Sequence, residues 1–164
     1  MKKQILLATT NKGKLNDVKE ILKDIDVEIL SFLDFDDYPN VEETGTTFLE
    51  NAELKATAAY YKYRLPSFGD DSGLESFQLN GEPGIYSARY AGEDADDGKE
   101  IKSAIGEIRG TIIKNPRGKN GFGYDPLFIP NGYDNTMAEL SHADKNRISH
   151  RLNAFKELKK ILVK

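Results

Sequence analysis

The sequence predicts an α/β fold, and the clearest signal lies at its start. Residues 4–9 form a short apolar run with the length and composition of a buried strand. Apolar residues then recur at helical spacing, at Leu15, Val18, Leu22 and Ile25. This spacing predicts a helix over residues 13–24, and residues 27–32 predict a second strand. In open α/β sheets, the loop after a strand of such a β-loop-α-β unit lies at the edge where ligands bind.

Further elements follow along the chain. After an acidic, turn-prone loop at residues 34–45, Thr47 and Glu50 match a capping box that begins an alanine-rich helix ending near residue 63. The later apolar segments are a strand at 74–79, a turn at 80–84, a strand pattern at 105–114 and a short run at 126–130. A second capping-box pattern at Ser141 predicts one closing helix, whose apolar face carries Ile148, Leu152, Phe155 and Leu162.

Length and composition predict one soluble domain, residues 1–164, with room for two lobes. No apolar run approaches the length of a membrane span and no signal-peptide core is present, so we expect no membrane partner and a cytoplasmic location. The absence of cysteine excludes disulfides and thiolate catalysis. A net charge of −4 argues against nucleic acid as a partner. An acidic protein still binds an anionic substrate where a few cations and a divalent metal converge.

A polar loop connects the first predicted strand to the first predicted helix. Its hydroxyl, amide and ammonium groups come from Thr9, Thr10, Asn11, Lys12, Gly13 and Lys14. Free backbone N–H groups and the helix dipole favour a phosphate at such a position. The spacing of a Walker A loop is absent. A polar helix cap with solvated lysines is the alternative interpretation.

Neighbouring carboxylates form a second polar group. Asp70 and Asp71 are adjacent in a turn before Ser72, and such a pair near a core needs a cation or a shared proton. Mg²⁺ prefers hard oxygen ligands of this kind, together with water and substrate phosphates.

Asn51 and Lys55 are four residues apart and share a helix face, which beside phosphates would carry a donor and a cation. For each group, side chains in water are the alternative.

An aromatic and glycine-rich string, followed later by basic residues, predicts a site for a nucleobase. Glycines beside Phe122 and Tyr124 let a flat base approach the backbone and stack on a ring. Imidazole, guanidinium and ammonium donors favour an acceptor such as the 6-oxo group of a purine. The candidate residues are Phe122, Gly123, Tyr124, Asp125, Lys145, His150 and Arg151. For the aromatic string, the alternative is a glycine-rich turn whose aromatic side chains belong to the core. For the basic residues, the alternative is an exposed helix surface.

Together these strings resemble the inosine/xanthosine triphosphate pyrophosphatases, a Ham1-like family of enzymes that remove non-standard purine nucleotides. The matching segments cover nearly the whole chain, at residues 9–14, 42–52, 70–74, 81–90, 121–126 and 145–151. The resemblance implies hydrolysis of ITP, dITP or XTP to a monophosphate and pyrophosphate. It also implies an elongated two-lobed fold around a long mixed sheet with flanking helices, an active site in the cleft between the lobes, and a homodimer.

The resemblance implies a role for each candidate residue. Asp71 would be the general base, and Glu43, Asp70 and Asp71 would hold Mg²⁺. The triphosphate would be bound by Thr9, Thr10, Asn11, Lys12, Gly13, Lys14, Asn51, Lys55 and Ser72. The base would be surrounded by the seven candidates of the aromatic string and the basic C-terminal motif.

The chain departs from the family pattern in one interval. Family members usually carry a helix and a pair of strands between the segments that match residues 87–92 and 106–110. Here only residues 93–105 fill that interval, so one lobe is shortened. None of the matched polar motifs falls within it. The shortening bears on the dimer contact and on closure of the cleft, because deleted strands leave their sheet neighbours unpaired.

Two other functions remain open from the sequence. The first is a nucleotide-binding protein whose catalysis is impaired by the missing segment. The second is a pyrophosphatase for pyrimidine or other modified nucleotides. The strings at residues 122–125 and 149–151 argue against the second.

Overall fold

The computed structural model describes residues 2–75, 84 and 102–162, and the chain divides into two compact units. Unit 1 comprises Met1–Leu15 and Asp26–Ser103, and unit 2 comprises Asn16–Ile25 and Ala104–Lys164. Helix α1, Lys12–Ile21, begins in unit 1 and continues in unit 2. Most of the strand and turn predicted over residues 74–84 lies outside the described residues.

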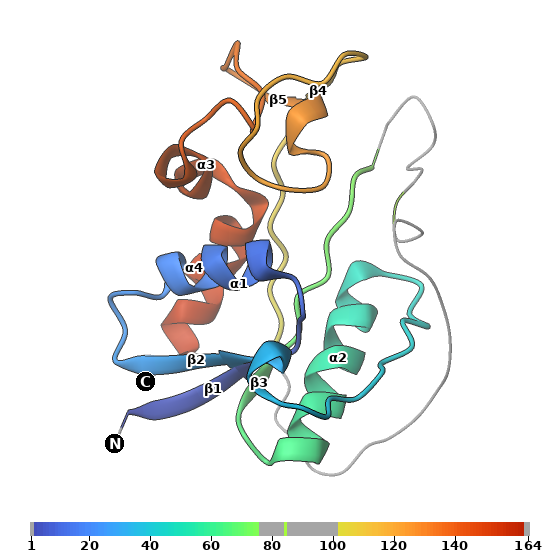
Figure 1. Cartoon of the computed structure of the whole chain (residues 1–164), viewed down its shortest axis with the longest axis vertical. Helices are drawn as coiled ribbons and strands as arrows, with labels where there is room; N and C mark the ends of the chain where they lie inside the picture. Colours follow the sequence, from blue (N-terminus) through green and yellow to red (C-terminus); the bar gives the residue numbers. More distant parts are fainter. Residues whose placement is uncertain (1, 76–83, 85–101, 163–164) are drawn as a thin grey trace. The chain divides into compact units, whose positions relative to one another are not determined.

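Unit 1 is built on a three-stranded parallel sheet in the order β2-β1-β3 (Figure 1). Strand β1, Lys3–Leu7, pairs along its whole length with β2, Val27–Ser31, and its last residues pair with β3, Ser67–Phe68. Parallel strands end at the same edge, so the segments after β1 and β3 leave the sheet as neighbours. The predicted β-loop-α-β order is confirmed, whereas β3 falls where the sequence indicates only a lead into the acidic turn.

Helix α2, Phe48–Tyr63, packs against the sheet of unit 1. Its start is the predicted capping box, because Thr47 Oγ1 accepts from the Glu50 backbone N–H at 3.1 Å and the Glu50 carboxylate accepts from the Thr47 N–H at 3.1 Å. Small side chains on α2 allow a close approach to the strands. The buried cluster between helix and sheet consists of Leu6, Ala8, Phe32 and Ala59.

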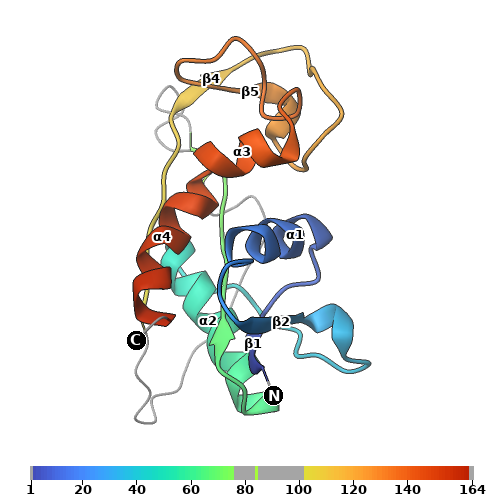
Figure 2. The ribbon, with the colours of Figure 1, turned by 90° about the vertical axis from the view of Figure 1, so that its left-hand side faces the viewer.

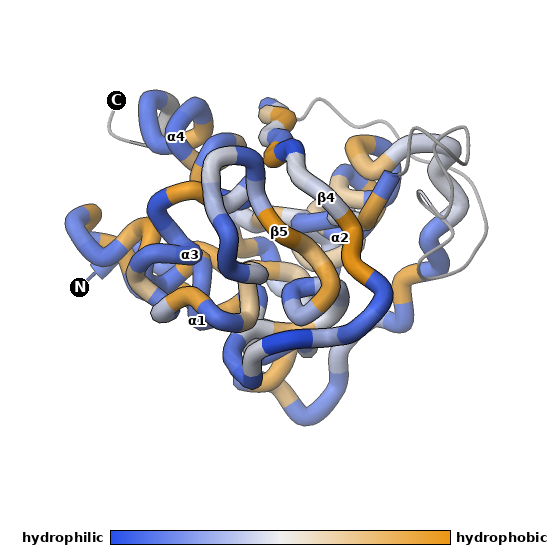
Figure 3. The backbone as a smooth tube through the Cα atoms, turned by 90° about the horizontal axis from the view of Figure 1, so that it is seen from above, coloured by the Kyte–Doolittle hydropathy of each residue, from blue (hydrophilic) through white to orange (hydrophobic). Residues whose placement is uncertain are grey.

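Unit 2 contains a two-stranded antiparallel sheet. Strand β4, Gly110–Ile112, pairs with β5, Phe128–Pro130. Both strands are shorter than the apolar patterns that predict them. The connection between them is mostly hydrophilic over residues 114–120, seen as the blue stretch after β4 in Figure 3. The long mixed sheet with a cleft between two lobes stays a prediction.

The predicted closing helix is two helices (Figure 2). Helix α3, His142–Ile148, and helix α4, His150–Leu162, are separated by Ser149, whose backbone is extended with φ −66° and ψ 150°. The Ser149 hydroxyl accepts from the Leu152 N–H at 3.1 Å and so caps α4. The prediction of one helix was wrong because the apolar spacing continues across the break, while the serine supplies a local alternative to helical hydrogen bonding.

Candidate functional site

The loop after β1 is organised by Asn11. Its side-chain oxygen accepts from the backbone N–H groups of Gly13, at 2.8 Å, and Lys14, at 3.1 Å. Thr9 Oγ1 accepts in turn from the Asn11 N–H at 3.1 Å. Asn11 therefore caps α1 and uses two of the N–H groups that the sequence assigns to a phosphate. The loop holds Lys14 in a defined place at the carboxyl edge of the sheet.

Lys14 joins this loop to the acidic turn that follows β3. Its ammonium donates to the backbone oxygen of Asp70 at 3.0 Å and lies 2.9 Å from the Asp70 carboxylate. Both side chains are largely buried, at 14% and 9% exposure. The parallel pairing of β1 and β3 explains the contact, since it sets both loops at one edge. Two motifs that are distant in the sequence thus form one polar group.

Lys55 of α2 connects two further candidate residues. Its Nζ lies 3.0 Å from Glu43 Oε1 and 2.8 Å from Asp71 Oδ1. The three side chains are between 11% and 19% exposed. One ammonium between two carboxylates offsets the repulsion that would otherwise separate them at such short range. The solvated alternative for Lys55 is wrong, and this bridge fixes where the Asp71 carboxylate lies.

The acidic turn is also held against α2 by close backbone packing. A Cβ added at Gly69 would overlap the backbone oxygen of Ala52. Asn51, on the same helix, is buried, and its side-chain oxygen accepts from the Gly45 N–H at 2.7 Å. The observed contact of Asn51 thus supports the loop that carries Glu43, and its predicted contact with phosphate stays a prediction.

The predicted ligands of Mg²⁺ are Glu43, Asp70 and Asp71, and the Asp70 carboxylate lies 2.9 Å from the ammonium of Lys14. Within residues 2–75, 84 and 102–162, no three His, Cys, Asp or Glu side chains form a metal-binding cluster. Mg²⁺ needs fewer, since it usually takes one or two carboxylates together with water and substrate phosphates. Oε2 of Glu43 is buried and accepts no hydrogen bond from the described part of the chain. Glu43 and Asp71 therefore fit a Mg²⁺ ion that the substrate helps to hold.

The candidate base-binding residues gather in unit 2 around Phe122. Asp125 Oδ2 accepts from the Phe122 N–H at 2.7 Å and lies 2.8 Å from Lys145 Nζ. The Lys145 ammonium lies 4.3 Å from the centre of the Phe122 ring, and the Arg151 guanidinium lies 5.7 Å from it. Cations over a ring face are attracted by its quadrupole. The sequence strings at 121–126 and 145–151 are thus brought together, as predicted for a base site.

Asp17 is a residue of this group that the sequence analysis missed. It is 1% exposed, and its carboxylate lies 3.0 Å from Arg151 Nη1, 3.0 Å from His142 Nε2 and 3.7 Å from Lys145 Nζ. Asp17 and Ile21 are four residues apart on α1 and share a face. In the sequence, the helical spacing of Asp17 and Ile21 could have indicated that Asp17 lies on a buried face of α1 and needs a basic partner.

The other candidate residues differ in how far they are exposed to solvent. Thr10 and Lys12 are exposed, Ser72 and His150 are partly buried, and the Tyr124 side chain is 42% exposed. Gly123 has a left-handed backbone with φ 59°. All candidates for phosphate and metal binding belong to unit 1, and all candidates for base binding belong to unit 2.

Comparison with known proteins shows similarity over nearly the full chain. A dITP/XTP pyrophosphatase of Oceanobacillus iheyensis is 42% identical, with 98% of each chain covered. A solved structure of the Staphylococcus aureus Ham1 protein is 40% identical and has a TM-score of 0.78, with 98% of both chains covered. A solved HAM1 protein of Coxiella burnetii is 36% identical, has a TM-score of 0.79 and covers 98% of both chains.

The same comparisons bear on the shortened interval. The alignment with the Oceanobacillus iheyensis protein spans 193 positions, whereas this chain has 164 residues, so the relative contains residues that have no counterpart here. A model of the Ham1 family matches in two pieces, residues 5–108 and 95–161. The two pieces overlap at residues 95–108, which include most of the interval, residues 93–105, where the sequence predicts the missing segment. The predicted resemblance is confirmed, and the chain belongs to the Ham1 family.

Proposed function

We propose that this protein hydrolyses dITP, ITP and XTP to the nucleoside monophosphate and pyrophosphate, and so removes deaminated purines from the nucleotide pool. Relatives named dITP/XTP pyrophosphatase, such as those of Oceanobacillus iheyensis and Bacillus subtilis, align over 98% of the chain at 42% and 40% identity and support this function. Within the structure, the observation that carries the proposal is the Lys55 bridge between Glu43 and Asp71.

In the proposed reaction, a water oxygen attacks the α-phosphorus, and the bond between that phosphorus and the bridging oxygen of the β-phosphate breaks. Asp71 accepts the proton that the water loses, and pyrophosphate leaves. Lys14 and Lys55 offset the negative charge that develops on the leaving group, because each ammonium carries three N–H donors. When bound by Glu43 and Asp71, Mg²⁺ supplies additional positive charge beside the phosphate oxygens.

Base selection is assigned to the group around Phe122. The ring offers a face on which a purine can stack, and Lys145 and Arg151 bring cations to within 4.3 and 5.7 Å of its centre. Ammonium and guanidinium groups are donors only. They therefore favour the 6-oxo acceptor of hypoxanthine or xanthine and disfavour the 6-amino donor of adenine. This chemistry favours ITP, dITP and XTP over ATP.

The test is pyrophosphate release from ITP, dITP, XTP, ATP and GTP, each with and without Mg²⁺. We expect metal-dependent release from the first three well above release from ATP and GTP. The contrast with ATP tests the contact to the 6-oxo group, which GTP shares with ITP and XTP. Asp71→Asn should abolish turnover and retain most nucleotide affinity, because it removes the proton acceptor and preserves the size of the side chain. Asp36→Asn, in an exposed loop, is the matched control and should behave as wild type.

One alternative has a specific observation in its favour. The chain lacks residues that its relatives have, as the alignment of 193 positions indicates. A protein that binds nucleotides without cutting them would retain affinity for ITP by calorimetry and release no pyrophosphate from any substrate. That result would replace the proposed hydrolase with a binding protein.

The remaining expectations are part of the same proposal. The partner is a small nucleoside triphosphate, nucleic acid is not a partner, the protein forms a homodimer, and it acts in the cytoplasm. Among the described residues, no helix is long and apolar enough to cross a membrane. Light scattering of the purified chain would give its mass in solution, and a monomeric mass would remove the dimer from the proposal.

A further inference from the structure

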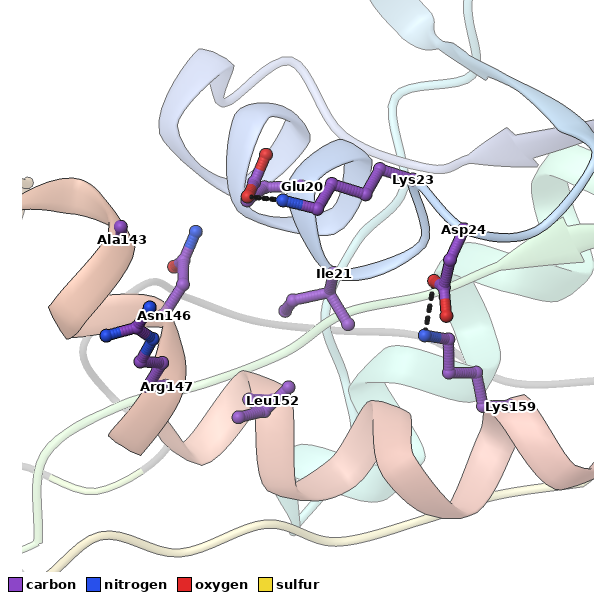
Figure 4. A pocket seen from close by; sticks show the side chains of 9 residues that line it. All are labelled: Glu20, Ile21, Lys23, Asp24, Ala143, Asn146, Arg147, Leu152 and Lys159. Carbon is purple, nitrogen blue, oxygen red and sulfur yellow. Dashed lines mark hydrogen bonds and ion pairs between the residues drawn. The ribbon is translucent and has the colours of Figure 1, made fainter.

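Unit 2 contains a pocket that is lined by a different set of residues from the candidates described above. It has a volume of about 400 Å³ and is lined by residues of α1, α3 and α4 and of the segment after α1. This volume lies within the range of sites for small molecules. Ile21, Ala143 and Leu152 give the pocket apolar walls (Figure 4). Its lining includes none of the candidate residues for base binding.

Asn146 is the uncharged polar side chain of this lining. The residue is 5% exposed, and both its amide nitrogen and its amide oxygen are buried without a hydrogen-bond partner among the described residues. In Figure 4 its side chain extends from α3 toward α1. A buried amide that lacks partners costs free energy, so such groups normally bind ordered water or a ligand. Asn146 offers one donor and one acceptor side by side.

The charges that line the pocket are largely neutralised by one another. Lys23 Nζ lies 2.5 Å from Glu20 Oε1, and Lys159 Nζ lies 2.5 Å from Asp24 Oδ1. The hydrogen bond from Lys159 also lowers the pKa of Asp24. The remaining charged residue of the lining, Arg147, lies 3.2 Å from Asp144, so each charged side chain of the lining already lies beside an opposite charge. The lining therefore fits an uncharged molecule.

We propose that this pocket is a second binding site that takes a neutral, flat heterocycle with a lactam edge, as found in an oxopurine or oxopyrimidine base. The ring N–H of a lactam donates to the Asn146 oxygen, and the lactam oxygen accepts from the Asn146 nitrogen. An asparagine amide forms a comparable pair of one donated and one accepted hydrogen bond with N7 and N6 of adenine. The apolar residues Ile21 and Leu152 contact the faces of the ring.

Two residues of the pocket are adjacent in the sequence to residues of the candidate base-binding group. On α3, Asn146 directly follows Lys145. Leu152 directly follows Arg151 on α4. A ligand that bridges α1, α3 and α4 would therefore stabilise the two helices that carry Lys145 and Arg151. The pocket is therefore suited to a free base that acts as an effector of the protein. This inference does not depend on the proposed reaction.

The test uses the full chain, labelled with ¹⁵N, and two probes, hypoxanthine and uracil. Asn146→Leu identifies the side-chain amide signals of Asn146 by their disappearance and keeps the pocket apolar. We expect a saturable shift of those signals with a probe, both in the wild type and in Phe122→Ala, which lacks the ring of the candidate base site. By calorimetry in the Phe122→Ala background, Asn146→Leu should raise the Kd about tenfold or more.

Two further variants sharpen this experiment. Ala143→Leu narrows the pocket while it keeps Asn146, and it should also weaken binding. Asn131→Ala, in an exposed turn, should leave the Kd unchanged. Loss of the shift in Phe122→Ala would place the probe at the candidate base site and overturn the proposal. A shift that fails to saturate with both probes would also overturn it, because the pocket would then hold water only.

Discussion

Arg151 and Asp17, which are 134 positions apart in the sequence, form a buried ion pair with Arg151 Nη1 3.0 Å from Asp17 Oδ2. The side chains are 2% and 1% exposed. The same carboxylate lies near His142 and Lys145. Two of these three basic residues, Lys145 and Arg151, also lie over the ring of Phe122. Asp17 is therefore the counterion that positions Arg151, and it shares Lys145 with Asp125, whose carboxylate lies 2.8 Å from the ammonium.

Asp17→Asn should destabilise the protein strongly. The substitution preserves the shape of the side chain and removes the buried carboxylate that pairs with Arg151, whereas Lys145 keeps its ion pair with Asp125. Removal of one partner of a buried ion pair typically costs about 3–5 kcal/mol of unfolding free energy. Urea unfolding measures this loss. Asp24→Asn is the control, because its ion pair with Lys159 is exposed and such pairs contribute little. Equal losses in the two variants would contradict the role assigned to Asp17.

Gly69→Ala should impair both stability and catalysis. Its new Cβ would overlap the backbone oxygen of Ala52, so the acidic turn must move away from α2. We expect a loss of about 1–3 kcal/mol of unfolding free energy and a fall in kcat, because Asp71 is displaced from Lys55. Ala52→Ser changes a side chain and leaves the backbone oxygen in place, so its kcat should be near that of wild type. A Gly69→Ala variant with unchanged stability would show that the turn is not packed as described.

Phe122→Ala should weaken substrate binding more than it slows the chemical step. Stacking of a base on an aromatic side chain contributes about 1–3 kcal/mol, so the KM for dITP should rise roughly tenfold or more. Because stacking is similar for all bases, the preference for dITP over dATP should change less than the KM. Steady-state kinetics with both nucleotides measures this split. An unchanged KM would remove Phe122 from the base site.

Stability should depend on pH through the capping box of α2. Hydrogen bonds, first that with the Thr46 side chain and then that with its backbone N–H, lower the pKa of Glu50 below its ordinary value. Its contribution to stability is therefore complete above the unfolded-state pKa and is lost as the pH falls through the lower folded-state pKa. Glu50→Gln should be less stable than wild type at pH 7, and the difference should shrink as the pH falls through this range. A difference that stays constant with pH would contradict this assignment.

Local signals in the sequence were sufficient for much of unit 1. The apolar run before Thr9 and the helical spacing after it predicted β1, α1 and β2 in the correct order, and Thr47 with Glu50 predicted the start of α2. These predictions succeed because a strand, a helix and a cap each depend on residues within a few positions of one another. Joint occurrence of the polar strings was also enough to identify the family.

The contacts that organise the candidate site were decided only by tertiary structure. No local pattern pairs Lys14 with Asp70, places Lys55 between Glu43 and Asp71, or brings Asp17 to Arg151. The sequence by itself determined the elements, the motifs and the family, because helical spacing, capping and motif strings are local properties of the chain. Only the tertiary structure decided which charges are buried and which cation each carboxylate contacts, because burial and ion pairing depend on residues that are far apart in the sequence and become neighbours on folding.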